Sequence, residues 1–146
     1  EKVAVIYQSF RLFPLLTVAE NIMYPMELRG IKTKEALKRA AKLAAQVELP
    51  AGVLDRFPTM LSGGEQQRVA IARALGMDTR VLLADEPTGN LDTANGDNIF
   101  SILEDLAHEQ GYCVIVVTHD PGLAARADRI TELRDGLIVS PEEALS

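Results

Sequence analysis

Short, almost purely apolar runs alternate along the chain with longer segments in which apolar residues recur at helical spacing. The short runs lie at residues 3–7, 81–84 and 113–117, and they carry almost no polar residue. Such runs are typical of strands that are buried on both faces of a parallel sheet. The alternation with helices therefore predicts an α/β fold, in which helices cover both faces of a mostly parallel sheet.

Five segments between and after these runs predict helices. Thr17 with Glu20, and Ser62 with Glu65, match the capping box that begins a helix. Pro25 is expected to kink or end the first helix, because proline has no backbone N–H and crowds the preceding turn. The predicted helices span about 17–26, 33–47, 62–75, 93–109 and 123–127, and a hairpin follows with its turn at Asp135-Gly136.

The composition describes one globular domain of 146 residues with 47% apolar residues and a net charge of -6. Cys113 is the single cysteine, which excludes a disulfide framework and favours a reduced compartment. The net acidity argues against nucleic acid as the main ligand, and Lys34, Lys38 and Lys42 are expected to form a solvated helix face. No apolar stretch approaches the roughly 20 residues that a membrane-spanning helix needs.

Polar side chains follow all three predicted strands. Gln8 follows the first strand, Asp85 and Glu86 follow the second, and His119 follows the third. Because parallel strands joined by a helical crossover end at one edge of the sheet, one crevice would collect an amide, two carboxylates and an imidazole. Taken singly, each has a plainer explanation, such as an acidic turn, a helix cap or a packing histidine. His108, on the polar side of a helix, is expected to be a solvated surface residue.

Asp85-Glu86 directly follows four apolar residues and has the form of a Walker B element. In such an element the first carboxylate helps to hold Mg²⁺, and the second polarises water for attack on a phosphoryl group. Two neighbouring negative charges in this position without a cation would destabilise the fold. The alternative for the pair alone is an acidic turn or a helix start.

The segment Ser62-Gly63-Gly64-Glu65 begins a predicted helix with two glycines, although glycine lowers helix propensity. We expect the glycines to leave the helix N-terminus uncovered. Its N–H groups, the helix dipole and the Ser62 hydroxyl would then form an anion site. The alternative is an ordinary capped helix with a flexible entry.

Taken together, these segments resemble the ATPase subunit of ABC transporters over nearly the whole chain. The stretch 61–75, Leu-Ser-Gly-Gly-Glu-Gln-Gln-Arg-Val-Ala-Ile-Ala-Arg-Ala-Leu, resembles the signature motif and its helix. Residues 7–8 resemble the Q-loop, 81–86 Walker B, 89–92 the D-loop and 118–120 the switch region. Segments 17–22 and 85–92 are most similar to the macrolide-exporter and lipoprotein-release branch, and Glu65 stands where many family members have Gln.

The resemblance implies a P-loop NTPase (RecA-like) core joined to an ABC-type α-helical subdomain. Residues 1–10 and 77–146 would belong to the core, and residues 11–76, including the signature helix, to the helical subdomain. It also implies a transport-coupled ATPase that uses ATP and Mg²⁺. Such a subunit would pair with a second ATPase subunit beneath transmembrane permease subunits, at the cytoplasmic face of the cell membrane.

The resemblance implies roles for the residues at the strand ends. Glu86 would be the general base, and Asp85 would help to hold Mg²⁺. His119 would contact the γ-phosphate and position the attacked centre. Gln8 would contact Mg²⁺ and water, and would link the site to the membrane subunits.

For the signature and D-loop segments, the resemblance implies contacts across a dimer. Ser62, Gly63 and Gly64, with Glu65 beside them, would bind the γ-phosphate of ATP held by a partner subunit. Asp92 would support the dimer contact. Residues 10–24 would lie near the surface that faces the permease.

The sequence contains no phosphate cradle of the form G-x-x-x-x-G-K-[ST], because none of its ten glycines precedes a lysine. In the family this Walker A motif precedes the Q-loop strand. We therefore interpret the chain as lacking the family's N-terminal portion. We expect it to bind MgATP very weakly and not to hydrolyse it, with the strand at 113–117 left as an unpaired apolar edge.

Two alternatives stay open from the sequence. The chain could be a truncated binding module whose signature face complements an intact partner subunit, and an upstream coding sequence with an in-frame Walker A motif would argue against this. It could also be a soluble ABC-type ATPase of repair or translation. The chain lacks the long coiled-coil insertion of the repair proteins and the D-loop histidine typical of translation factors. Its residues do not indicate a transported substrate.

Overall fold

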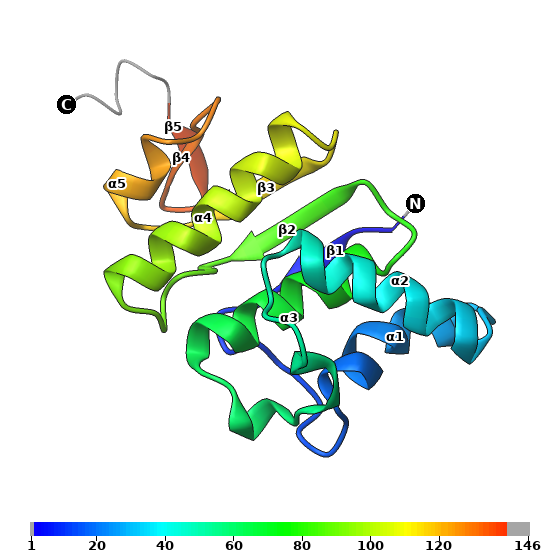
Figure 1. Cartoon of the computed structure of the whole chain (residues 1–146). Coiled ribbons are helices and arrows are strands. Elements are labelled where there is room, and N and C mark those ends of the chain that lie inside the picture. The colour runs from blue at the N-terminus through cyan, green and yellow to red at the C-terminus, as the bar shows by residue number, and fades with distance from the viewer. Residues whose placement is uncertain (1, 140–146) are drawn as a thin grey trace.

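A three-stranded parallel sheet in the order β1-β2-β3 forms the centre of the structure. This is a computed structural model that describes residues 2–139, with β1 at Ala4–Ile6, β2 at Val81–Asp85 and β3 at Cys113–Val117. Ile6 pairs with Ala84, and Asp85 pairs with Val117. The predicted α/β fold with a parallel sheet is confirmed, and the three strands end at one edge (Figure 1).

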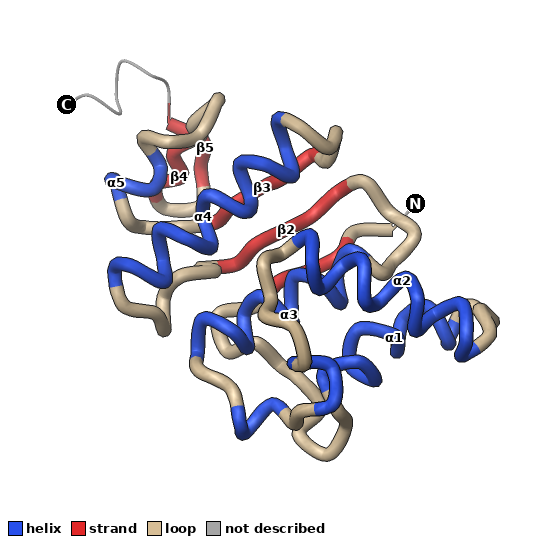
Figure 2. The backbone as a smooth tube through the Cα atoms, viewed as in Figure 1, coloured by secondary structure: helices blue, strands red, loops and turns tan. Residues whose placement is uncertain are grey.

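Helices make both connections between these strands (Figure 2). Helices α1, α2 and α3 pack on one another, and α3 also contacts β1 and α4. The signature helix α3 therefore lies between the other helices and the sheet. The remaining elements are α1 (Val18–Leu28), α2 (Thr33–Gln46), 3₁₀ turns at Val53–Asp55 and Pro58–Met60, α3 (Gly63–Leu75), α4 (Thr93–His108), α5 (Pro121–Ala124), and the antiparallel pair β4 (Glu132–Arg134) and β5 (Leu137–Val139).

Both predicted capping boxes form. The Glu20 N–H donates to Thr17 Oγ1 at 3.2 Å, and the Thr17 N–H donates to Glu20 Oε1 at 3.0 Å. Ser62 and Glu65 make the same pair of bonds at 3.3 and 3.0 Å. Two orphan N–H groups are thus satisfied at the start of each helix, which fixes where α1 and α3 begin.

Pro25 does not end α1, which continues to Leu28. The missing N–H weakens the turn after the proline. Met26, in that turn, is only 2% exposed and belongs to the main hydrophobic core. Burial of apolar area therefore holds the last turn in place, where helix propensity alone would end it. None of the helices in residues 2–139 combines the length and apolarity needed to cross a membrane.

Within residues 2–139 helices cover only one face of the sheet. Ile6 and Leu82 lie on the covered face, where they are 1% and 0% exposed. Ile115 and Val117, on the opposite face of the edge strand β3, are 49% and 50% exposed. The prediction that both faces are covered is wrong for residues 2–139. An apolar run shows that both faces of a strand are apolar, but it does not show which segment covers each face.

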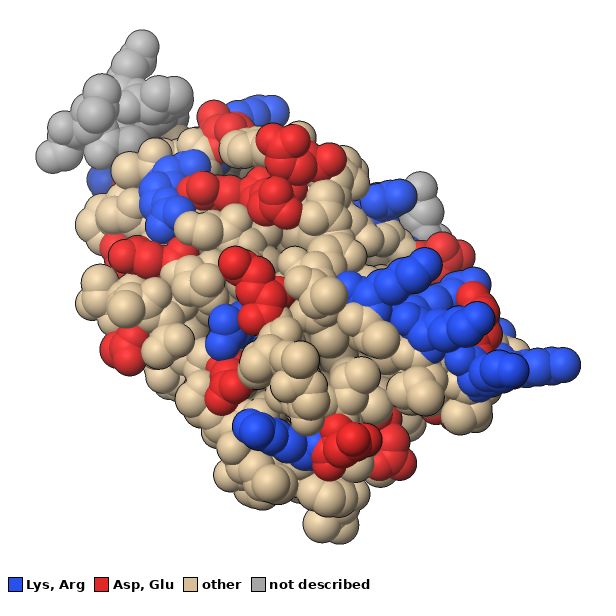
Figure 3. All heavy atoms as spheres, viewed as in Figure 1, with Lys and Arg blue, Asp and Glu red and all other residues tan. Residues whose placement is uncertain are grey.

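The outer face of α2 is basic. Lys34, Lys38 and Lys42 are exposed at successive i, i+4 positions, whereas Ala36 and Ala40 are buried. Figure 3 shows lysine and arginine side chains gathered over this helix. The predicted solvated basic face is confirmed, and it belongs to a different element from the strand ends that carry the candidate site.

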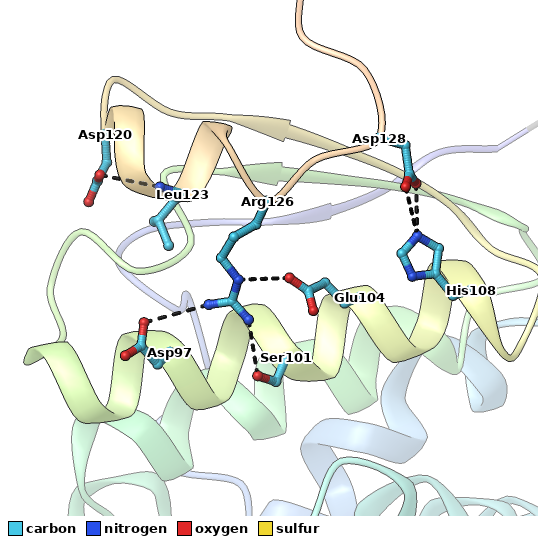
Figure 4. A network of polar contacts seen from close by, with 8 residues as sticks. All are labelled: Asp97, Ser101, Glu104, His108, Asp120, Leu123, Arg126 and Asp128. Carbon is cyan, nitrogen blue, oxygen red and sulfur yellow. Dashed lines mark hydrogen bonds and ion pairs between the residues drawn. The ribbon is translucent and has the colours of Figure 1, made fainter.

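The segment after β3 docks on α4 through three ionic contacts, one of which joins Arg126 to Asp97 at 3.6 Å (Figure 4). Arg126 Nε donates to Glu104 Oε1 at 2.7 Å. His108 Nε2 lies 2.8 Å from Asp128 Oδ2, and the hydrogen bond with Asp128 raises the pKa of His108. His108 is exposed as expected, but it also binds Asp128, because the chain returns over the C-terminal end of α4.

Candidate functional site

Glu86 and His119 are in direct contact at the carboxyl edge of the sheet. The Glu86 N–H donates to the carbonyl of Val117 at 2.8 Å, which places Glu86 beside the end of β3. Its Oε1 accepts hydrogen bonds from the His119 N–H at 3.1 Å and from His119 Nδ1 at 2.5 Å. The Glu86 side chain is 22% exposed and that of His119 is 93% exposed. The carboxylate is thus held in the structure while the imidazole ring faces solvent.

Glu86 also has an unusual backbone conformation. Its φ is +47°, in the left-handed region that residues other than glycine rarely adopt. Such a conformation costs on the order of 1–3 kcal/mol and persists only where surrounding contacts fix it. Here the bond to Val117 on one side and the Gly89 N–H to Glu86 carbonyl bond of 3.1 Å on the other supply those contacts. Strain of this kind is often found at functional sites.

Asp85 is the last residue of β2 and is exposed. Residues 2–139 provide no hydrogen bond or ion pair to its carboxylate. Carboxylate and amide oxygens such as those of Asp85 and Gln8 are the ligands that Mg²⁺ prefers. The same described residues contain no cluster of three or more His, Cys, Asp or Glu side chains that would hold a metal alone.

Gln8 contacts the loop that follows Glu86. Gln8 Nε2 donates to Asn90 Oδ1 at 3.3 Å, and Asn90 Nδ2 donates to the Gln8 carbonyl at 3.1 Å. A Cβ at Gly89 would lie 2.5 Å from Gln8 Nε2, so the Gln8 side chain lies directly against Gly89. The structure therefore brings Gln8 to the same edge as Asp85, Glu86 and His119.

The start of α3 is only partly open. Ser62 is exposed and Gly63 is half-buried, but Gly64 is buried. A Cβ at Gly64 would lie 2.4 Å from Asn95 Oδ1, and a Cβ at Gly63 would lie 3.3 Å from Leu91 Cδ2. The expectation that both glycines leave the helix start uncovered is wrong at Gly64, because the side chain of Asn95 on α4 lies against it.

Asp92 caps α4 and binds the same Asn95. The Asn95 N–H donates to Asp92 Oδ1 at 2.8 Å, and Asn95 Nδ2 donates to Asp92 Oδ2 at 3.1 Å. The backbone bond and then the side-chain bond from Asn95 lower the pKa of Asp92. Asn95 thus links the start of α4 to Gly64 at the start of α3. No hydrogen bond within residues 2–139 joins this pair of helix starts to Glu86 or His119.

Gln67 is a buried neighbour of the site that is not among the residues predicted from the sequence. It is 0% exposed on α3, and its Nε2 donates to the carbonyls of Tyr7 at 3.1 Å and Pro87 at 2.6 Å. The signal was its place four residues before Ile71, on the apolar stripe of the helix. A polar residue on such a stripe indicates a buried hydrogen-bond partner.

An apolar patch lies on α1 and on the segment that precedes it. Leu15 is 87% exposed, and Phe13 and Tyr24, whose ring centroids are 4.7 Å apart, are 40% and 41% exposed. The fully buried Asn21 fixes this segment: its Oδ1 accepts from the Phe13 N–H at 2.8 Å, and its Nδ2 donates to three backbone carbonyls, those of residues 13, 16 and 17. An ordered, exposed apolar patch is typical of a protein interface.

Two cavities of the described chain lie away from these residues. One, of about 210 Å³, lies between α4 and β3 and is lined by Leu103, Val116 and Arg126 among others. The other, of about 540 Å³, lies at the amino ends of the strands beside Val3 and Tyr112. The predicted site residues form an open edge and not an enclosed crevice. A second surface would therefore be needed to exclude water from a ligand bound there.

The family model described as ABC transporter matches residues 1–89, and the chain belongs to this family. The chain is 48% identical over 135 residues to the lipoprotein-releasing system ATP-binding protein LolD 1 of Rhodospirillum rubrum, covering 92% of this chain and 59% of that protein. It is 47% identical over 140 residues to the macrolide export ATP-binding/permease protein MacB of Neisseria meningitidis, covering 96% of this chain and 21% of that protein. The chain spans less than two thirds of the length of these relatives.

A solved structure has the same fold. The dimeric structure of the bacterial ABC transporter cassette MJ0796 matches with a TM-score of 0.81 and 41% identity, over 94% of this chain and 61% of that one. A post-hydrolysis dimeric structure of MJ0796 bound to ADP and Pi matches with the same TM-score and 40% identity. The predicted ABC cassette fold is confirmed, and so is the similarity to proteins of lipoprotein release and macrolide export.

Proposed function

We propose that this chain forms part of an ATP-hydrolysing subunit that drives an ABC transporter through nucleotide-dependent dimerisation. The contact that carries the proposal is the one between Glu86 and His119, which places a fixed carboxylate at the strand ends beside Gln8. The names of the relatives, which are ATP-binding proteins of transport systems, support a transport ATPase over a repair or translation ATPase.

The edge residues have distinct tasks in this proposal. Glu86 accepts the proton of the water that attacks the γ-phosphoryl group. Asp85 and Gln8 would hold Mg²⁺, which when bound neutralises charge on the phosphate oxygens. His119, engaged by Glu86 through Nδ1, orients the base and presents its exposed ring to the γ-phosphate.

The signature face serves the nucleotide of the opposite subunit. Ser62 and Gly63 supply contacts to its γ-phosphate, since Ser62 is exposed at the start of a 13-residue helix whose dipole favours an anion. Gly64 allows Asn95 of α4 to lie close to the start of α3. Glu65 fixes the start of α3 by accepting a hydrogen bond from the Ser62 N–H. Asp92 supports the dimer contact. The open edge at Glu86, which needs a second surface, is consistent with this arrangement.

Replacement of Glu86 by glutamine tests the proposed chemistry in the full chain as its gene encodes it. Glu86→Gln keeps the shape and removes the base. ATP turnover should fall by about 10²–10⁴-fold, while ATP binding persists and a dimer accumulates in ATP. Glu109→Gln, at an exposed position after α4, is the matched control and should retain turnover. Wild-type turnover in Glu86→Gln would exclude Glu86 as the base.

The 146 residues contain no Gly-Lys pair and hence no Walker A cradle. We propose that a polypeptide of these residues alone binds MgATP weakly and does not hydrolyse it, because phosphoryl transfer depends on positioning and on neutralising phosphate charge. Titration calorimetry with MgATP and phosphate release measure both properties. Micromolar affinity together with turnover would contradict this.

The membrane partner is a permease at the cytoplasmic face, contacted through the patch of Phe13, Leu15 and Tyr24. Phe13 and Leu15 belong to the segment that directly connects Gln8 to α1, so a partner bound there would act on the chain that leads to Gln8. Leu15→Asp should abolish copurification with the permease without affecting folding, because the side chain is 87% exposed. Leu137→Asp, 72% exposed on β5, is the control. Equal retention in both variants would exclude the patch as the docking site.

A further inference from the structure

One buried side chain on the signature helix holds both loops that carry the candidate catalytic groups. Gln67 Nε2 donates to the carbonyl of Tyr7, the residue before Gln8, and to the carbonyl of Pro87, the residue after Glu86. These bonds measure 3.1 and 2.6 Å and join α3 to residues 60 and 20 positions away in the sequence. A shift of α3 would therefore move both loops.

We propose that Gln67 is a positioning residue, which sets the separation between Gln8 and Glu86 and ties both to the signature helix. This inference rests on the proposed function. Gln67 touches neither nucleotide nor water in this scheme and acts only through the two backbone carbonyls. Its effect should therefore appear in the rate of turnover more than in the binding of ATP.

The carbonyl oxygen of the Gln67 side chain, Oε1, indicates that Gln67 is not simply a stabilising core residue. Its Oε1 is buried and has no hydrogen-bond partner within residues 2–139. A buried acceptor without a donor destabilises a fold, and a methionine of similar size would avoid that cost. Ile71, one turn later on the same stripe, is apolar and equally buried. What the amide adds at position 67 is its NH₂ group, which meets both carbonyls.

The surrounding contacts would transmit a displacement to the site. Gln8 and Asn90 exchange two hydrogen bonds, and the Gln8 side chain lies directly against Gly89. The loop at Gln8 and the loop after Glu86 are therefore in contact at the edge of the sheet, and Gln67 on α3 binds the backbone of both. Without the NH₂ group, the exposed Gln8 to Asn90 contact would supply the remaining hydrogen bonds that the described residues make between the two loops beyond the strand pairing. Misplacement by about 1 Å is enough to cost about 10²-fold in rate.

Gln67→Met tests the inference in the full chain, with Gln46→Met as the control. Gln46 also loses an amide hydrogen bond, to Gln110, but far from the site. In nucleotide-free Gln67→Met, the amides of Phe10 and Gly89, which bond to the carbonyls of Tyr7 and Glu86, should exchange hydrogen about 10-fold faster. The kcat per folded molecule should fall about 10–100-fold, with KM for ATP changed less than about threefold.

Gln67→Glu supplies a second measurement, the pH dependence of kcat, which a simple loss of packing would not change. A protonated carboxyl donates one hydrogen bond and replaces one of the two that Gln67 makes, whereas an ionised carboxylate faces two carbonyl oxygens and repels them. The kcat of Gln67→Glu, relative to wild type, should therefore rise as the pH falls, and that of Gln67→Met should not.

Two results would overturn the inference. The first is wild-type kcat and wild-type exchange in Gln67→Met. The second is a loss of turnover that only matches the loss of folded protein. Absence of hydrolysis in the wild type would instead overturn the proposed function, and the exchange rates of Phe10 and Gly89 would still decide whether Gln67 holds the two loops.

Discussion

The carboxylate of Glu86 accepts two hydrogen bonds from one residue, His119, whose backbone N lies 3.1 Å and ring Nδ1 2.5 Å from Glu86 Oε1. The two residues are 33 positions apart, and the crossover through α4 brings them together. The backbone bond fixes the distance, and the ring bond fixes the direction of the carboxylate. Removal of the ring should therefore affect chemistry more than folding.

His119→Ala should lower kcat about 10²–10⁴-fold in the full chain, because the base loses its orienting partner and the phosphate loses a contact. The free energy of unfolding should stay within about 0.5 kcal/mol, since the side chain is 93% exposed. Steady-state hydrolysis and denaturant unfolding measure these two effects. His108→Ala, which removes the contact with Asp128, is the histidine control and should keep kcat. Unchanged turnover in His119→Ala would exclude the proposed role.

Gly64→Ala should destabilise the fold by about 1–3 kcal/mol, as expected for overpacking at a tight contact. The new Cβ would lie 2.4 Å from Asn95 Oδ1, and Asn95 cannot move away freely because it is bonded to Asp92. Urea unfolding measures the loss. Gly63→Ala should cost less, since its Cβ would lie 3.3 Å from Leu91 Cδ2.

A double-mutant cycle identifies the origin of that cost. If the clash with Asn95 is the cause, Asn95→Ala should remove most of the effect of Gly64→Ala. Equal effects of Gly64→Ala in the presence and absence of the Asn95 side chain would show that the contact does not matter.

Stability should fall on acidification as the helix caps are lost. The bond from the Ser62 N–H is the largest cause that lowers the pKa of Glu65. A carboxyl with a lowered pKa in the folded state contributes stability above its unfolded pKa, and this contribution is lost as the pH falls through the folded value. The loss should therefore begin below the ordinary glutamate pKa of about 4.3.

Unfolding free energies between pH 7 and pH 2 measure this loss. Glu65→Gln, which keeps an oxygen that accepts from the Ser62 N–H, should show a shallower decline over the acidic range. His108, whose pKa is raised, is charged in both the folded and the unfolded state well below the ordinary histidine pKa of about 6.5, so its contribution to stability does not change over the acid limb. An unchanged slope in Glu65→Gln would show that the cap does not govern the acid limb.

The polypeptide of residues 1–146 should self-associate through β3. In the described sheet β3 is an edge strand, and its Ile115 and Val117 are about half exposed. Ile115→Lys places a charge on this apolar surface and should reduce light scattering at a given concentration without loss of helical circular dichroism. Leu137→Lys, at a 72% exposed position on β5, is the control. Equal scattering by wild type and Ile115→Lys would exclude this face as the site of association.

The local signals in the sequence predicted most of the fold. β1 and β3 lie within their predicted runs, and β2 extends one residue past its run, to Asp85. The bounds of α2, α3 and α4 lie within one residue of the predicted ones. The capping pair Ser62 and Glu65 explains the start of α3, because a cap depends only on residues three positions apart. The start of α5 was placed two residues too late. Asp120 accepts bonds from the N–H groups of Gly122 and Leu123, and Pro121 occupies the first helical position.

The sequence correctly predicted that the polar residues following the three strands lie together at one edge of the sheet. Gln8, Asp85, Glu86 and His119 lie at one edge because parallel strands share their direction. The proposed division into core and helical subdomains, and the roles of these residues in catalysis, stay predictions.

The sequence by itself determined the strands, the helix starts and the family, because these depend on periodicity, capping and motif spacing within short segments. Only the tertiary structure decided that Gln67 meets two carbonyls, that Asn95 covers Gly64, and that one face of the sheet is open within residues 2–139. Each of these relationships joins segments 20 or more residues apart. Their geometry follows from how helices and sheet pack, which no local pattern of residues specifies.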